Sequence, residues 1–470
     1  MLKKRNLGVL KLLTGNVLSQ AIAIATLPLL ARSYSPEQFG GLAIITSLSS
    51  IIASVGCLRY EIAIVIPKSH RKAMDIATLA AFVAAAATLV FFFILFLFEK
   101  ELEQFLSGER PYENNFKIAV LVAANCFSNI FSYLNIRNKR YGAQSVFRTI
   151  SSAINAIAAV CLIPFSGGIG NGLIDAFVCA QALSLIVAVV LAKDIPCIKN
   201  LFQPNFLRVK SVAVEYRRFP MFSVLPTLLN TISWMAPAII LGWYFDSAVV
   251  GLYSVGFRLL QVPLSLIINS LSQVFLHEAS QAIRTGKLSQ LVEDSLIRLA
   301  IVGFPFVVLL YTFGRSICKL ALGSGWEDAG IFMEYLAPWA YLWLITSPLS
   351  VIFTVLKKPH LELLTQSCIF LFRVIALFAG GIYGDRFIAV GSFSMAGVLG
   401  YSLLFMTITK CCNISNFVLL FKNYRVFMTS MGYLFCTTIV AVCFGVGVLG
   451  FTLCAALSVL YVLANKRFVC

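Results

Sequence analysis

The chain of 470 residues is 59% hydrophobic and only 12% charged, with a mean hydropathy of +0.89. This composition excludes a soluble globular domain and is typical of an all-α polytopic membrane protein. The net charge of +17 does not indicate nucleic acid binding, because the basic residues lie in short segments between apolar runs rather than on one face.

Apolar runs long enough to cross a bilayer follow one another along the whole chain. They predict about fourteen transmembrane helices, over residues 12–31, 41–66, 74–98, 116–136, 149–165, 173–192, 221–245, 249–276, 297–321, 331–356, 363–383, 387–408, 427–444 and 446–464. A count of twelve is the alternative, because Gly445, Gly447 and Gly450 leave the last two runs without a defined boundary.

The distribution of lysine and arginine predicts the orientation of these helices. With the N-terminus in the cytoplasm, 27 of the 37 basic side chains fall in cytoplasmic segments and 7 on the opposite side. Both termini are therefore expected to be cytoplasmic.

A basic segment near the midpoint of the chain predicts the domain organisation. Residues 193–220 are interpreted as a cytoplasmic connector between two six-helix lobes, residues 1–192 and 221–410. Residues 411–470 are expected to form two peripheral helices.

An internal comparison favours a repeat. A shift of 210 residues aligns Tyr34 with Tyr244 and Gly41 with Gly251. Because six helices separate the two copies, the repeat is expected to be parallel, with a pseudo-two-fold axis along the membrane normal.

Charged residues inside the predicted spans are costly and usually face a bundle interior or a water-filled cavity. Away from the ends of these spans, Arg59, Arg258 and Arg373 are accompanied by one acidic residue, Glu61. This surplus of positive charge predicts a cavity that favours an anion. Guanidinium groups bind phosphate oxygens in bidentate geometry. Snorkelling to the bilayer surface is the alternative for Arg59 and Arg258.

The spacing of Arg59 and Glu61 predicts how their side chains are oriented. Two positions apart on one helix, they would point about 200° away from each other. Their partners are therefore expected to lie elsewhere.

Uncharged polar residues form a second feature of the predicted helices, and several are one turn apart. They are candidates for lining a hydrated pathway for a hydroxyl-rich substrate. Hydrogen bonding between helices is the alternative. The candidates are Asn16, Gln20, Asn125, Asn129, Asn230, Asn269 and Gln273.

The remaining reactive residues show no site pattern. Most of the thirteen cysteines lie inside apolar runs, and the three histidines are far apart, so no metal-ligand spacing occurs. The sequence therefore predicts no metal site, and no constellation of catalytic groups indicates an enzyme.

Four N-terminal motifs and one central cluster carry a resemblance. They are Thr14-Gly15-Asn16, Leu27-Pro28-Leu29-Leu30-Ala31-Arg32, Tyr34-Ser35-Pro36-Glu37-Gln38-Phe39-Gly40, Leu58-Arg59-Tyr60-Glu61-Ile62-Ala63-Ile64-Val65-Ile66-Pro67, and Val250-Gly251-Leu252-Tyr253 followed by Arg258. With these motifs the chain resembles the Wzx-type oligosaccharide flippases of the multidrug/oligosaccharidyl-lipid/polysaccharide export superfamily.

The resemblance implies two six-helix lobes around a central cavity, in the inner membrane of a bacterium. It implies that undecaprenyl-diphosphate-linked oligosaccharide moves from the inner to the outer leaflet by alternating access, for O-antigen (lipopolysaccharide) or another surface polysaccharide. The diphosphate would bind Arg59, Arg258 and Arg373. Expected partners are the lipid-linked oligosaccharide, membrane lipids and the polysaccharide polymerase machinery, with no nucleic acid.

No cofactor is expected, and coupling to an H+ or Na+ gradient, with Glu61 as the candidate residue, stays open. Two alternatives remain. A cation-coupled multidrug antiporter of the same superfamily would have an acidic cavity, and a membrane-embedded polymerase or ligase would need a large reactive outer loop. Residues 99–115 are the longest outer loop and are short and acidic.

Overall fold

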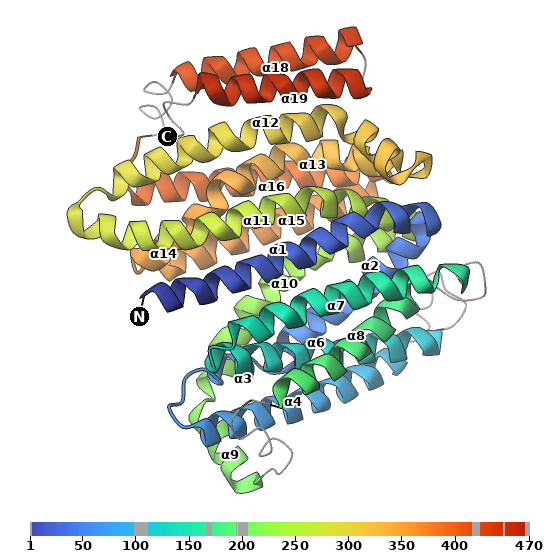
Figure 1. Cartoon of the computed structure of the whole chain (residues 1–470), viewed down its shortest axis with the longest axis vertical. Coiled ribbons are helices and arrows are strands. Elements are labelled where there is room, and N and C mark those ends of the chain that lie inside the picture. Colours follow the sequence, from blue (N-terminus) through green and yellow to red (C-terminus); the bar gives the residue numbers. More distant parts are fainter. Residues whose placement is uncertain are drawn as a thin grey trace. The chain divides into compact units, whose positions relative to one another are not determined.

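A computed structural model of the protein describes residues 2–97, 111–165, 172–193, 195, 205–415, 424–444 and 447–465. Throughout these ranges the regular secondary structure is helical (Figure 1). Contacts divide the chain into two compact units, Met1–Gly251 and Leu252–Cys470. The long helix α11 begins in the first unit and continues into the second.

The first unit consists of helices that cross back and forth. They are α1 (Leu2–Ser33), α2 (Pro36–Gly56), α3 (Tyr60–Ala63), α4 (His70–Leu97), α6 (Pro111–Arg137), α7 (Tyr141–Cys161), η1 (Ile163–Phe165), α8 (Gly172–Ala192), α9 (Phe206–Glu215) and α10 (Arg218–Tyr244). The helix α1 packs along α7, α7 packs against α8, and α2 packs against α10 and α6.

The second unit has the same character. After α11 (Ser247–Thr285) come α12 (Leu288–Leu322), η3 (Ser324–Trp326), α13 (Glu327–Thr346), η4 (Ser347–Val351), α14 (Ile352–Val355), α15 (Pro359–Ile382), α16 (Arg386–Cys411), α18 (Tyr424–Phe444) and α19 (Val448–Ala464). The strongest pairings are α12 with α13 and α15 with α16.

The predicted all-α architecture is confirmed, because each of the fourteen predicted runs overlaps at least one long helix. In the described part of the chain, eleven helices are long and apolar enough to cross a membrane, and two shorter apolar helices, Met428–Cys443 and Leu449–Ala464, lie near the C-terminus. The helix α7 is not among the eleven, because polar residues along one face lower its hydropathy.

Two of the predicted helices are broken. The run 41–66 was expected to be one helix, and this prediction is wrong: α2 ends at Gly56, and Leu58 and Arg59 adopt left-handed backbone angles (φ 47° and 62°) before the single turn of α3. The run 331–356 is interrupted by η4, whose first turn contains Pro348. Proline removes an amide donor, so the α-helical hydrogen bonding changes there.

Parts of the domain prediction fall outside the described residues. In the connector 193–220, residues 194 and 196–204 are not described, and the remainder contains α9 and the start of α10. Residues 99–110 of the predicted acidic loop, and residues 416–423, 445–446 and 466–470, also lie outside the description.

The first turns of α2 and α11 touch each other reciprocally. Each helix starts after a capping residue, Ser35 or Asp246. A Cβ atom at Gly40 would overlap the carbonyl oxygen of Ser247, and one at Gly251 would overlap that of Pro36. Only glycine permits this approach.

Both reciprocal pairs are related by a shift of 211 residues, from 36 to 247 and from 40 to 251. The sequence comparison used a shift of 210 residues, so its register is wrong by one. The two segments form an isologous contact, in which the same surface is used twice.

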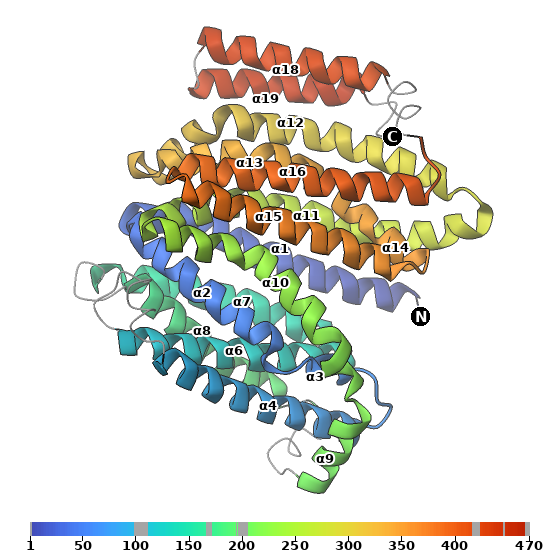
Figure 2. The same cartoon turned by 180° about the vertical axis from the view of Figure 1, so that it is seen from behind.

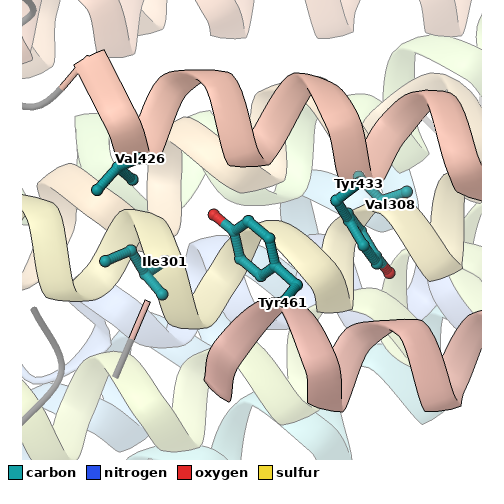
Figure 3. Packing of buried hydrophobic residues seen from close by; sticks show 5 residues of the cluster. All are labelled: Ile301, Val308, Val426, Tyr433 and Tyr461. Carbon is teal, nitrogen blue, oxygen red and sulfur yellow. The ribbon is translucent and has the colours of Figure 1, made fainter. Parts of the chain in front are cut away.

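The two C-terminal helices α18 and α19 lie side by side and pack against α12 (Figures 1 and 2). Their shared core consists of Ile301, Val308, Val426, Tyr433 and Tyr461 (Figure 3). The hydroxyl of Tyr433 lies 2.7 Å from Ser458 Oγ, and that of Tyr461 lies 2.7 Å from Ser430 Oγ. Each tyrosine thus buries its ring while its hydroxyl is satisfied.

Candidate functional site

The break between α2 and α3 brings an arginine and a glutamate together. The Nη1 atom of Arg59 lies 3.1 Å from Glu61 Oε1. The expectation that these side chains point apart is wrong, because the backbone leaves the helix at Leu58 and Arg59. The side chain of Glu61 is only 4% exposed and that of Arg59 is 22% exposed. The carboxylate is therefore buried, whereas the guanidinium is partly accessible.

The second oxygen of Glu61 distinguishes this pair from a closed ion pair. Oε2 is buried and accepts no hydrogen bond from the described residues. A buried carboxylate oxygen without a donor is costly unless a proton or cation reaches it. The pair can therefore respond to a bound ion or to protonation.

A second arginine fixes the segment that follows. Arg137, at the end of α6, donates from Nη1 to the carbonyl oxygen of Ile64 at 3.1 Å and from Nη2 to that of Ser69 at 3.0 Å. Backbone groups outside a helix need such partners. Arg137 thus holds the chain between α3 and α4 in place, and with it the pair Arg59–Glu61.

A polar stripe runs along the contact between α1 and α7. Arg148 Nη1 donates to Asn16 Oδ1 at 3.0 Å, and one turn further Ser152 Oγ donates to the carbonyl oxygen of Ser19 at 2.7 Å. The guanidinium of Arg148 remains exposed while this neutral amide orients it. Because an amide does not cancel the charge, Arg148 can still attract an anion.

Three atoms of the same stripe form no hydrogen bond with any residue that the structure describes. They are Gln20 Oε1, Ser151 Oγ and Asn155 Oδ1, all buried. Arg148, Ser151 and Asn155 recur at spacings of three and four and share one face of α7, just as Asn16 and Gln20 share one face of α1. Oxygen atoms without donors favour ligands that carry hydroxyl groups. We call these five residues the α1/α7 stripe.

Arg148 is a residue that the sequence interpretation missed. It was assigned to a cytoplasmic segment before a helix at 149–165, but α7 begins at Tyr141, so Arg148 lies two turns inside it. Helical spacing back from Asn155 and Ser152 to Arg148 is the signal that could have found it.

Arg373 lies in a cage of three aromatic rings in the second unit and is only 2% exposed. Its guanidinium carbon Cζ lies 4.3 Å from the ring centroid of Trp339, 5.0 Å from that of Phe393 and 5.6 Å from that of Tyr401. A cation over an aromatic face is attracted by the ring quadrupole, most strongly when water is excluded. The rings therefore stabilise the charge inside the bundle.

One glycine makes room for this aromatic cage. Phe393, Gly397 and Tyr401 follow one another at steps of four on one face of α16. A Cβ atom at Gly397 would lie 2.6 Å from the Trp339 ring. The absence of a side chain at Gly397 lets Trp339 reach the guanidinium.

The other predicted site residues differ in how far they are exposed. Arg258, Asn129, Asn230 and Asn269 are exposed, and Asn125 is half-buried. Gln273 lies in α11, but its side chain is outside the described part of the structure. The structure thus joins Arg59 with Glu61 and groups Asn16 and Gln20 with Arg148.

A comparison with protein families decides the classification. Residues 29–330, more than half of the chain, match the family described as "Polysaccharide biosynthesis protein". The chain belongs to this polysaccharide biosynthesis family. A curated relative is the "Succinoglycan biosynthesis transport protein ExoT" of Rhizobium meliloti (strain 1021), 22% identical over 324 residues. The match covers 67% of this chain and 62% of that protein, less than two thirds of the relative's length.

Two solved structures resemble the fold of this family member. A "Lipid II flippase MurJ, inward closed conformation" has a TM-score of 0.76 at 12% identity and covers 98% of both chains. An inward-facing multidrug resistance MATE family transporter of the MOP superfamily has a TM-score of 0.61 at 13% identity, covering 85% of this chain and 95% of that one. The protein is therefore an all-helical, multi-pass membrane protein that shares its fold with these two structures.

Proposed function

We propose that this family member is a flippase. It moves undecaprenyl-diphosphate-linked oligosaccharide repeat units from the inner to the outer leaflet of a bacterial inner membrane by alternating access, for O-antigen or another surface polysaccharide. Membership of the polysaccharide biosynthesis family, the named transport role of ExoT and the likeness to the MurJ fold support this function.

The observation that carries the proposal is the α1/α7 stripe. It combines an exposed guanidinium, held by Asn16, with three oxygen atoms that form no hydrogen bond in the described part of the chain. An oligosaccharide supplies many hydroxyl donors, and an attached diphosphate supplies negative charge. We place Asn16, Gln20 and Arg148 on the path of the sugar, together with the predicted Asn125, Asn129, Asn230, Asn269 and Gln273.

We assign the diphosphate to Arg59, Arg258 and Arg373, as the sequence suggested. Arg258 is exposed and Arg59 is partly exposed, so both are within reach of a headgroup. Arg373 is enclosed by aromatic rings, so it contacts the diphosphate only in a state in which the aromatic cage is open.

We further propose that both termini are cytoplasmic and that residues 1–192 and 221–410 are the two moving lobes. Residues 193–220 connect them, and residues 411–470 form peripheral helices. In this orientation a substrate with two negative charges gains roughly 4.6 kcal/mol per 100 mV of inside-negative potential as it moves outward, at about 2.3 kcal/mol per charge. Glu61 is the candidate for any coupling to H+ or Na+.

A cation-coupled multidrug antiporter is the second candidate. The fold is shared with a MATE transporter, and Glu61 presents a buried oxygen that accepts no hydrogen bond from the described residues. Such a carboxylate could bind the coupling cation.

A deletion strain distinguishes the two functions. The flippase predicts that lipid-linked oligosaccharide accumulates on the inner leaflet and that surface glycan is lost, with unchanged drug sensitivity. Drug hypersensitivity with normal surface glycan would instead support the antiporter. Complementation by the wild-type chain is the control.

A further inference from the structure

A cavity of about 660 Å³ lies within the second unit, between α11, α12 and the segment from the end of α13 to η4. Its lining is largely apolar and includes Leu271, Val274, Leu299, Val302, Leu344 and Leu349. This volume is within the range of sites that hold small ligands. None of its lining residues belongs to the α1/α7 stripe, to the Arg59–Glu61 pair or to the aromatic cage around Arg373.

The cavity is open along one side. Val274 is 53% exposed and Val302 is 45% exposed, and both line it. Exposed valine and leucine side chains in a membrane-spanning segment are favourable next to hydrocarbon and costly next to water. The cavity therefore suits the hydrocarbon chain of a lipid.

Two opposite charges line the same cavity. Glu278 lies seven residues before the end of α11, and Arg298 lies ten residues after the start of α12. At 1.5 Å per residue they are about 10 and 15 Å from the connection between these helices, at similar depth. Within the described residues their side chains form no ion pair with each other. The cavity thus offers one carboxylate and one guanidinium beside an apolar channel.

This combination selects among lipid headgroups. A phosphoethanolamine carries a phosphate, which matches a guanidinium, and an ammonium, which matches a carboxylate. A phosphoglycerol has no cation for Glu278, and a sugar-linked diphosphate would place two negative charges beside that carboxylate.

We propose that this cavity is a binding site for phosphatidylethanolamine. One acyl chain lies along Val274 and Val302, the phosphate binds Arg298, and the ammonium binds Glu278. The bound phospholipid fills the space between α11 and α12. This site is additional to the substrate path and does not depend on which molecule is transported.

Lipid competition tests the proposal. The purified full-length chain is incubated with equal amounts of phosphatidylethanolamine and phosphatidylglycerol, and retained lipids are counted by native mass spectrometry. The wild type is expected to retain phosphatidylethanolamine about tenfold over phosphatidylglycerol, which corresponds to the loss of one charge pair. Glu278→Gln should reverse this preference, because only the guanidinium remains, and Arg298→Gln should abolish retention of both.

A cavity-filling variant and a matched surface variant supply the control. Val302→Trp blocks the cavity and should lower retention, whereas Val459→Trp, at a 61% exposed position of α19, should leave it unchanged. Thermal unfolding checks that each variant is folded, and Leu271→Trp replaces Val302→Trp if the latter is not. Equal retention of the two phospholipids, retention unaffected by the folded cavity-filling variant (Val302→Trp or Leu271→Trp), or retention of a polyprenyl phosphate in their place would overturn the proposal.

Discussion

The α1/α7 stripe and the aromatic cage around Arg373 solve the same problem in opposite ways. Both hold a guanidinium on a helix of a membrane protein, where an isolated charge is costly. Three rings enclose Arg373, whereas one neutral amide orients Arg148 and leaves it exposed. The comparison teaches that depth in the bundle does not by itself identify a ligand-binding charge. What matters is whether the protein already satisfies that charge.

The strongest test of this contrast is removal of the caged guanidinium. Arg373→Ala leaves a cavity beneath three rings and should cost about 3 kcal/mol or more, as for other large-to-small core substitutions. The unfolding temperature in detergent should therefore fall by several degrees, and the abundance of the variant in the membrane should fall as well. An unchanged unfolding temperature would contradict the stabilising role of the aromatic cage. Lost surface glycan at matched protein abundance would support the proposed contact of Arg373 with the diphosphate.

The room for the Trp339 ring provides a second test. Gly397→Ala places a methyl group against that ring, and overpacking of this kind costs about 1–3 kcal/mol. The matched control is Gly391→Ala on the same helix, whose added methyl group would lie 3.6 Å from Tyr335, an ordinary contact. Only Gly397→Ala should lower the unfolding temperature. Equal stability of the two variants would show that the aromatic cage tolerates displacement of Trp339.

The exposed arginine should behave in the opposite manner. Arg148→Gln removes a charge that the protein does not neutralise, so transport should fall about tenfold, equivalent to 1.4 kcal/mol, while the unfolding temperature stays unchanged. Asn16→Asp should also slow transport, because an ion pair would then occupy the guanidinium. Surface glycan at matched protein abundance is the measurement. If Arg148→Gln unfolds the protein, as Arg373→Ala is expected to do, the contrast between the two regions fails.

The smallest expected effect concerns Glu61. Glu61→Gln removes the acceptor charge beside Arg59 and should change transport by only about threefold, because the pair is partly exposed and hydrogen bonding persists. If Glu61 couples transport to an ion, the variant also loses its dependence on the pH or Na+ gradient while its response to membrane potential remains. Retained gradient dependence would exclude Glu61 as the coupling residue.

Most of the fold followed from the sequence because hydrophobic length is a strong signal in membranes. The break after α2 did not follow, since Leu58 and Arg59 adopt left-handed angles that no glycine marks. The expected separation of Arg59 and Glu61 failed for the same reason. The predicted register of the repeat was also wrong by one residue. The reciprocal contact depends on close backbone approach at Gly40 and Gly251 rather than on identical residues at aligned positions.

The site was predicted less well than the fold. Asn16 and Gln20 were identified by their spacing, but Arg148 was assigned to a loop because the start of α7 was placed eight residues too late. The enclosure of Arg373 was not foreseen, since Trp339 and Phe393 lie far from it in sequence and meet it only through packing. Helix boundaries and long-range ring contacts are three-dimensional facts that residue patterns leave open.

The central claim is tested most directly by reconstituting the purified chain in vesicles that carry an undecaprenyl-diphosphate-linked oligosaccharide. The fraction of sugar accessible to an enzyme on one side is followed over time under an imposed membrane potential. The account predicts movement that accelerates when the potential favours transfer of two negative charges and that falls in Arg148→Gln and Arg258→Gln. Lipid-linked sugar that stays in its original leaflet, in vesicles where the same chain moves an organic cation, would contradict it.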